Sequence, residues 1–201
     1  MLSSLTRKLE KKIRKYQKRK NKFWFRFYKS SRSGLTECNS SLNIVQFTKI
    51  KGEGKIVIKD NVTLGYALSP GLTTSEIYIE SRRTGSSIII GENVHINNNS
   101  TIISDKSSIH IGKDSLIGPG FNCLGSNFHP IDPKNRHTLD YDCKPIHIGD
   151  NVFIGANVTV LQGSWIGDNS VIGAGCTISG DIPKNSIVKP VQGNVIPMRT
   201  S

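Results

Sequence analysis

The chain's five histidines are its candidates for proton transfer near neutral pH, because imidazole has the side-chain pKa closest to that range. His129 and His137 fall in one polar stretch, SNFHPIDPKNRH. Pro130 restricts His129 to an extended backbone, which helps to fix the direction of its side chain. An imidazole held in this way can act as a general base and contribute roughly 10²–10⁴ to a reaction rate.

A repeat of six residues determines which element must position these histidines. Apolar residues recur at strict intervals of six, and Gly follows four of the first five: Ile148, Ile154, Val160, Ile166, Ile172 and Ile178. A period of six fits neither an α-helix nor a flat amphipathic strand. It predicts a parallel β-helix, in which each unit makes one short strand and one corner, and stacked coils bury a continuous core.

The same register separates the β-helix from its insertions. It continues towards the N-terminus, with gaps, at Ile58, Leu64, Ile90, Ile96, Ile102, Ile111, Ile117 and Cys123. Cys123 and Ile148 are 25 residues apart, which is not a multiple of six. We therefore expect a protruding loop at about 125–145. Residues 66–87 contain a Pro-Gly turn and a polar stretch, and we expect a second excursion there.

This register also sorts the histidines. His95, His110 and His147 each immediately precede an anchor of the repeat. Alternation along a strand turns such residues outward, so we interpret these three as exposed face residues. His129 lies in the expected loop, and loops on a repeat scaffold often carry the binding function. It is therefore the leading candidate for chemistry.

The positive charge is concentrated in the N-terminal segment. Residues 1–33 hold 13 of the 27 Lys and Arg and a single acid, and the remainder has 14 basic and 14 acidic residues. Apolar residues at spacings of three or four predict a basic helix that ends in the aromatic cluster FWFRFY. This helix is either solvated or packed in a trimer, or it lies at an anionic membrane with Trp and Phe at the headgroup boundary. We expect no nucleic-acid partner, because the body is neutral and shows no recognised module.

The cysteines and the lengths of the apolar runs indicate the cellular compartment in which the protein is expected. The four cysteines form no CxxC pair, and Cys123 and Cys176 fall on the repeat register. We expect packed thiols in a reducing compartment. No apolar run precedes the basic residues, and no stretch is long enough to cross a bilayer. We therefore expect neither a signal peptide nor a membrane span.

Four stretches together resemble the hexapeptide-repeat acetyltransferases. They are His129-Pro130, KPIHIGDNVFIGANV over 144–158, IGAG over 172–175 and DIPKNS over 181–186. They are most similar to the galactoside and maltose O-acetyltransferase group and to O-acetylating enzymes of bacterial surface polysaccharides. The resemblance covers roughly residues 90–196. It implies an all-β, left-handed parallel β-helix, a homotrimer, acetyl-CoA as donor and active sites between neighbouring subunits.

The resemblance implies an O-acetyltransferase that moves acetyl from acetyl-CoA directly to a sugar hydroxyl. His129 would remove the hydroxyl proton and later protonate the leaving thiolate, while a partner on its other nitrogen sets the tautomer. A backbone amide on a rigid coil would stabilise the oxyanion. We expect no covalent enzyme intermediate and no metal.

The resemblance, carried over residue by residue, also gives binding residues. Acceptor contacts fall at Asn97 and Asp105, which as Asn and Asp could instead be corner residues. His137, in the same loop as His129, is a further candidate. The coenzyme A contacts are Phe153, Ala156, Ala174, Ser179 and Asn194. Trp165 shares with Phe153 an outward position before an anchor, and these aromatics either cover the pantetheine or pack a trimer interface.

Departures from the family pattern shift some of these contacts. Ser179-Gly180 stands where the family commonly has Thr-Lys, and the usual G-x-P-A-[KR] stretch is replaced over 189–194. Phosphate binding is therefore assigned to Lys184, Lys189 or Arg199. The acidic acceptor contact of the galactoside enzymes has no counterpart in residues 1–35. We thus expect a polymeric or lipid-linked cell-surface glycan as acceptor, and a cytoplasmic enzyme peripheral to the inner membrane.

Three other functions stay open. An N-acetyltransferase of a nucleotide-linked amino sugar would share the fold and the donor. A β-helical zinc hydratase would need three ligand histidines to meet across a subunit boundary, and a non-catalytic scaffold would need no site at all. In each case the expected organisation is a basic helix over 1–35, a β-helix over 36–190 and a tail over 191–201.

Overall fold

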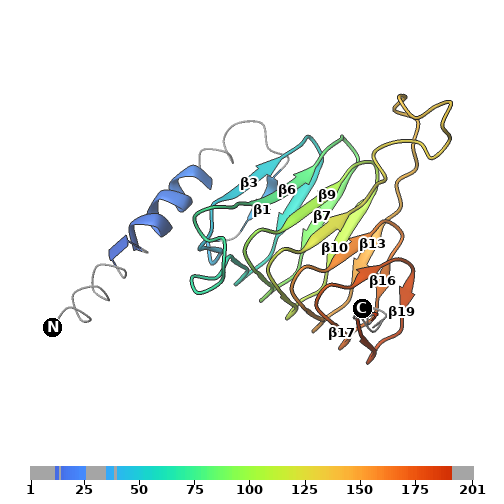
Figure 1. Cartoon of the computed structure of the whole chain (residues 1–201). Coiled ribbons are helices and arrows are strands. Elements are labelled where there is room, and N and C mark those ends of the chain that lie inside the picture. Colours follow the sequence, from blue (N-terminus) through green and yellow to red (C-terminus); the bar gives the residue numbers. More distant parts are fainter. Residues whose placement is uncertain (1–11, 14, 26–34, 39, 192–201) are drawn as a thin grey trace, which may run out of the picture.

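The computed structural model describes residues 12–13, 15–25, 35–38 and 40–191, and its strands form three parallel sheets (Figure 1). Sheet A contains β1 (Leu35–Cys38), β4 (Lys55–Ile58), β7 (Ser87–Ile90), β10 (Ser108–Ile111), β13 (Ile146–Ile148), β16 (Trp165–Ile166) and β19 (Asp181–Ile182). Sheet B contains β2 (Asn43–Ile44), β5 (Thr63–Leu64), β8 (His95–Ile96), β11 (Leu116–Ile117), β14 (Phe153–Ile154), β17 (Val171–Ile172) and β20 (Ile187–Val188). Sheet C contains β3 (Thr48–Lys51), β6 (Ile77–Ser81), β9 (Thr101–Ser104), β12 (Asn122–Leu124), β15 (Thr159–Leu161) and β18 (Thr177–Ile178).

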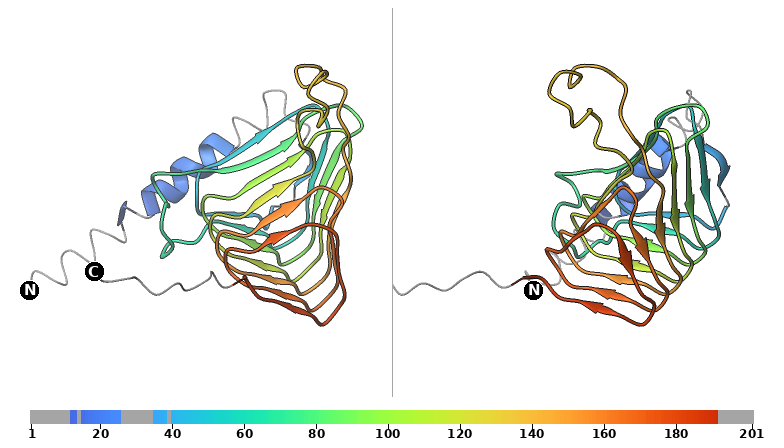
Figure 2. Two further views of the ribbon diagram at one scale, coloured as in Figure 1. Left: turned by 45° about the vertical axis from the view of Figure 1, so that its right-hand side comes forward. Right: turned by 90° about the vertical axis from the view of Figure 1, so that its right-hand side faces the viewer.

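Every third strand shares a sheet, so the chain winds as a three-sided parallel β-helix. Figure 2 shows the triangular cross-section of the coils. Successive coils place like residues on top of one another, as in the register pairs Ile111 with Ile148 and Ile148 with Ile166. The anchors of the six-residue repeat lie inside the prism, and Ile148, Ile154 and Ile166 have no exposed surface. The predicted parallel β-helix is therefore confirmed.

Asparagine makes the corners between sheets A and B possible. Six successive corners have φ between 53° and 60°, and the residues there are Asn61, Asn93, Asp114, Asn151, Asn169 and Asn185. This left-handed region is costly for most L-residues and is tolerated best by Asn and Gly. Side-chain amides link neighbouring coils, as where Asn151 Nδ2 donates to Asn169 Oδ1 at 2.9 Å.

The predicted excursion over residues 66–87 is only partly correct. Residues 66–76 do leave the sheets, but Ile77–Ser81 is β6, which pairs with both β3 and β9. Ile77 and Ile79 are fully buried in the core. The sequence analysis missed this strand because the polar residues that follow β6 interrupt the six-residue spacing of apolar residues. Buried Asn98 holds the excursion in place by accepting from Tyr66 N and donating to the carbonyl oxygens of Tyr66, Ser69 and Pro70.

A helix lies at the N-terminal end of the prism. Residues 12–13 and 15–25 are helical, Phe25 is buried with the first coil, and Asn21 Nδ2 donates to Val45 O at 2.8 Å. An end coil needs such a cap because its apolar interior has no next coil to cover it. In the part of the chain that the structure describes, no helix is long and apolar enough to cross a membrane. Cys123 and Cys176 are buried, as expected for packed thiols.

Candidate active site

A long loop joins sheet C to sheet A in the middle of the prism. Strand β12 ends at Leu124 and β13 begins at Ile146, and the residues between them project outward from this edge (Figure 2). Residues 131–140 are all exposed. The next equivalent connection, between β15 and β16, contains only residues 162–164. The loop that carries His129 is therefore an insertion at one edge of the prism.

Tyr141 fixes the C-terminal side of this loop to the prism. Its hydroxyl donates to Asp105 Oδ2 at 2.6 Å, and its ring is buried. Lys106 donates to the carbonyl oxygens of Leu139 and Tyr141, and its ammonium lies 4.2 Å from the centre of the Tyr141 ring. These contacts combine a charge-assisted hydrogen bond with a cation–π interaction.

Asp105 is the centre of this anchor. Its carboxylate has no exposed surface and accepts from Arg83 Nε at 2.9 Å as well as from Tyr141. Arg82 Nη1 lies 3.5 Å from the same carboxylate. The hydrogen bonds to Tyr141 and Asp105 raise the pKa of Arg83. The sequence suggested Asp105 as an acceptor contact. In the structure one of its oxygens accepts from Tyr141 of the loop and the other accepts from Arg83.

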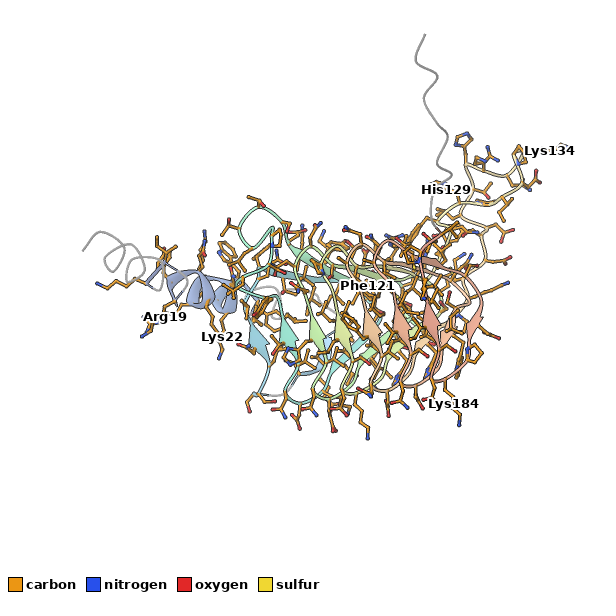
Figure 3. The ribbon with its side chains drawn as sticks, turned by 60° about the horizontal axis from the view of Figure 1, so that its bottom comes forward. Arg19, Lys22, Phe121, His129, Lys134 and Lys184 are labelled. Carbon is orange, nitrogen blue, oxygen red and sulfur yellow. The ribbon has the colours of Figure 1, made fainter. Side chains whose placement is uncertain are left out.

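His129 lies on the opposite arm of the loop (Figure 3) and is exposed. Its Nδ1 is 3.1 Å from Arg136 O. A carbonyl oxygen can only accept, so this bond requires a proton on Nδ1. Nε2 of the neutral ring then carries the lone pair and is available as a base.

A tight turn brings Arg136 back to His129. Asp132 Oδ1 accepts from Lys134 N at 3.0 Å, and Asp132 O accepts from Asn135 N at 3.1 Å. Arg136 Nη2 reaches back to Ile131 O at 3.1 Å. The loop therefore orients the imidazole through its own local bonds. His137, the other candidate in the loop, is exposed.

Several predicted ligand residues line one edge of the prism, where sheet B turns into sheet C. Ala156 and Ala174 occupy this corner on successive coils, and Gly175 N donates to Ala156 O across them. Asn97 and Lys189 follow strands β8 and β20 at the same corner. Beside it on sheet B, a groove of about 180 Å³ is lined by Tyr66, His95, Asn97, Leu116 and Phe153.

Other predicted residues lie elsewhere. Trp165 projects from sheet A, where its ring stacks on His147 at 4.0 Å, and His147 stacks on His110 at 5.0 Å. Lys184 lies at the corner between sheets A and B, in a groove of about 590 Å³ shared with Trp165 and two aspartates. Ser179 is exposed at the corner between sheets C and A. Asn194 and Arg199 lie outside the described residues.

The outward histidines do not come together within one chain. His95 is exposed on sheet B, while His110 and His147 are half-buried on sheet A. Burial lowers the pKa of His147, and neighbouring His110 lowers it further. Within the described ranges, no three His, Cys, Asp or Glu residues are grouped closely enough to hold a metal ion.

Sequence reasoning missed the residues that hold the loop and its base. Arg136 contributes a backbone carbonyl, which its side-chain type does not reveal. Arg83 and Lys106 read as ordinary surface charges. Tyr141 had the clearest signal, because it and Phe128 are the two residues of Phe, Tyr or Trp type in the loop.

Comparison with known proteins gives consistent matches. The family model for the bacterial transferase hexapeptide (six repeats) matches residues 145–180. Galactoside O-acetyltransferase of Escherichia coli K12 is 42% identical over 112 residues, which are 56% of this chain and 54% of that protein. The chain spans about half the length of this relative and of several other curated acetyltransferases that it matches.

Two further matches are longer. The putative lipopolysaccharide biosynthesis O-acetyl transferase WbbJ of Escherichia coli K12 is 30% identical over 155 residues, covering 73% of this chain and 74% of that protein. The crystal structure of the polySia specific acetyltransferase NeuO superposes with a TM-score of 0.55 at 25% identity, covering 80% of this chain and 64% of NeuO. The chain belongs to the hexapeptide-repeat acetyltransferases. Within that family it is similar to galactoside O-acetyltransferase and to the putative lipopolysaccharide biosynthesis O-acetyl transferase WbbJ.

Proposed function

We propose that this protein transfers acetyl from acetyl-CoA to a sugar hydroxyl, with His129 as the general base. One observation carries the proposal beyond family membership: the 3.1 Å contact between His129 Nδ1 and Arg136 O. It selects the tautomer whose Nε2 can accept the hydroxyl proton. The remaining loop contacts hold that ring on an otherwise exposed arm.

The chemistry follows from this tautomer. Nε2 removes the proton as the hydroxyl oxygen attacks the thioester carbonyl, and the imidazolium then protonates the departing thiolate. Arg136 O stabilises the imidazolium by accepting from Nδ1–H throughout. A backbone amide of a rigid coil supplies the hydrogen bond to the oxyanion.

The position of the loop supports a site shared between copies of the chain. His129 extends from the edge between sheets C and A, whereas Asn97, Ala156 and Ala174 lie at the edge between sheets B and C. Exposed Leu116 pairs with exposed Phe153, and half-buried Val171 joins Phe153 to exposed Ile187, so an apolar stripe runs along sheet B. Contiguous apolar surface of this kind marks an association surface. A homotrimer, with loop and coenzyme edge from neighbouring subunits, would bring the two halves together.

The acceptor that we propose is a cell-surface polysaccharide or its lipid-linked precursor. WbbJ and NeuO are named for lipopolysaccharide biosynthesis and for polySia, and WbbJ matches over most of both chains. Residues 131–140 are exposed, so the loop beside His129 is open to solvent, as an extended glycan acceptor would require. Membership of the same family also supports a left-handed β-helix. We place the enzyme in the cytoplasm because acetyl-CoA is available there.

The test measures thiol release from acetyl-CoA with a panel of bacterial surface glycans. Glycan-dependent release should fall at least about 10²-fold in His129→Ala, because a positioned base contributes roughly that much. Lys134→Ala is the matched control, since it removes an exposed side chain from the same loop and touches none of the predicted contacts. Equal losses in the two variants, or none in His129→Ala, would remove His129 as the base.

A coenzyme A binding measurement separates the alternatives. If wild type and His129→Ala bind coenzyme A equally well, His129 acts in the chemical step and not in binding the donor. Acetylation of an amino sugar in preference to every hydroxyl acceptor would favour the N-acetyltransferase. Absence of coenzyme A binding would contradict the acetyltransferase and favour a scaffold.

A further inference from the structure

The helix at the N-terminal end carries a concentration of cations that the proposed reaction does not use. Its described residues include Lys12, Lys15, Lys18, Arg19, Lys20 and Lys22, and none of the described helical residues is acidic. All six of these side chains are exposed. The rest of the chain beyond residue 33 is electrically balanced, so the positive surface is localised at one end of the molecule.

One side of this helix packs against the prism. Asn21 donates to Val45 O, and Phe25 is buried with the first coil. Gln17, Lys20, Asn21 and Trp24 line a groove of about 610 Å³ against residues 72–76 of the first excursion. These contacts fix the rotation of the helix about its own axis.

The opposite side combines cations with aromatic rings. At 100° per residue, Lys12, Tyr16, Arg19 and Phe23 form one stripe on the side away from Asn21, and Lys15 and Lys22 flank it. Tyr16 is 69% exposed and Phe23 is 64% exposed. We call these six residues the outward face. Figure 3 shows Arg19 and Lys22 on the helix that projects from one end of the prism, with His129 towards the other.

We propose that the outward face binds the surface of an anionic lipid bilayer. Cations attract the phosphates of anionic lipids, and exposed aromatic rings beside them lie favourably at the headgroup boundary. A bilayer offers a broad flat surface, which suits a single projecting helix. A nucleic-acid strand would need a basic groove that continues over the body, and the neutral prism does not offer a positive surface of that extent.

The anchor of the helix gives this binding a mechanical consequence. Because Phe25 and Asn21 join the helix to the first coil, contact with a bilayer also orients the prism. The prism is then held by its N-terminal end, and the loop lies several coils away along its axis. This proposal does not depend on His129 or on acetyl transfer.

The test is co-sedimentation of the full chain with vesicles of phosphatidylcholine, with and without phosphatidylglycerol. We expect binding only to the anionic vesicles, with a large loss at about 1 M salt, where the screening length is about 3 Å. The charge-reversal variant R19E/K22E should bind at least about tenfold more weakly. The matched control K55E/K113E makes the same change in net charge on exposed lysines of the prism and should bind nearly as wild type.

A second variant tests the aromatic part of the face. Y16S/F23S should bind anionic vesicles several-fold more weakly and should retain the salt dependence. All altered side chains are exposed, so thermal unfolding should be unchanged and will verify folding. Equal loss in R19E/K22E and K55E/K113E, or equal binding to neutral vesicles, would overturn the proposal. So would a change of oligomeric state in R19E/K22E, or binding of a single-stranded oligonucleotide more tightly than anionic vesicles.

Discussion

The prism and the loop over residues 125–145 are held by different kinds of interaction. In the prism, fully buried side chains such as Ile148 and Ile154 stack on their equivalents in adjacent coils, and backbone bonds such as Gly149 N to Ile166 O at 2.8 Å join each coil to the next. In the loop, residues 131–140 are exposed, and the main attachment is Tyr141 on Asp105. The buried core of the prism therefore supplies most of the free energy of unfolding, while the placement of His129 depends on a few side-chain bonds.

The largest expected effect tests this division directly. Ile154→Ala deletes fully buried atoms and should lower the free energy of unfolding by about 2–5 kcal/mol. Ile131→Ala removes the same atoms from an exposed loop position and should change it by less than about 0.5 kcal/mol. Urea denaturation measures both, and a comparable loss in the two variants would contradict the division.

The next effect concerns the attachment of the loop. Tyr141→Phe removes a hydroxyl that donates to a buried carboxylate, a bond worth about 1.5–3 kcal/mol. We expect hydrogen exchange over residues 125–145 to accelerate about tenfold and kcat to fall by a similar factor, with little change in Tm. Tyr16→Phe, an exposed tyrosine on the N-terminal helix, is the control. If the loop exchanged as in wild type, Tyr141 would not be its main attachment.

A smaller effect tests why asparagine recurs at the corners of the prism. Asn151 has a φ of 53°, so Asn151→Ala should cost about 1–2 kcal/mol in the free energy of unfolding. Asn151→Gly should be close to wild type because glycine adopts this region freely. Equal losses for Ala and Gly would instead assign the effect to the amide bond with Asn169.

The smallest effect separates a prism histidine from the loop histidine. Burial, and then His110, lower the pKa of His147 below its ordinary 6.5. The unfolded chain therefore takes up this proton first, so stability is lost as pH falls from 6.5 towards the lower folded-state pKa. His147→Gln should flatten the fall in Tm below pH 6.5, whereas His137→Gln should not. If Tm fell with pH in His147→Gln as steeply as in wild type, protonation of His147 would not contribute to the loss of stability.

Much of the fold could be predicted because the β-helix follows from a short sequence pattern, the six-residue repeat, that recurs many times along the chain. The spacing of Ile148, Ile154 and Ile166 predicts buried positions, which the structure confirms. The left-handed backbone at Asn151 and the other corner asparagines was found only in the structure. The strand β6 escaped this reasoning because polar residues on both sides of it interrupt the count. Partners of His129 and Asp105 could not be predicted, since Arg136 acts through its backbone and Tyr141 is 36 residues away from Asp105.

The sequence by itself determined that the chain coils, where the loop leaves the coil and which histidine the loop carries. The reason is that period, corner residues and insertions are all properties of neighbouring residues. Only the tertiary structure decided which nitrogen of His129 is free, that Asp105 is buried under Tyr141, and that Phe153 and Trp165 lie on different faces. The free nitrogen of His129 depends on how the loop folds back on itself. The other facts depend on how the loop and the coils pack in three dimensions, which the order of residues along the chain does not reveal.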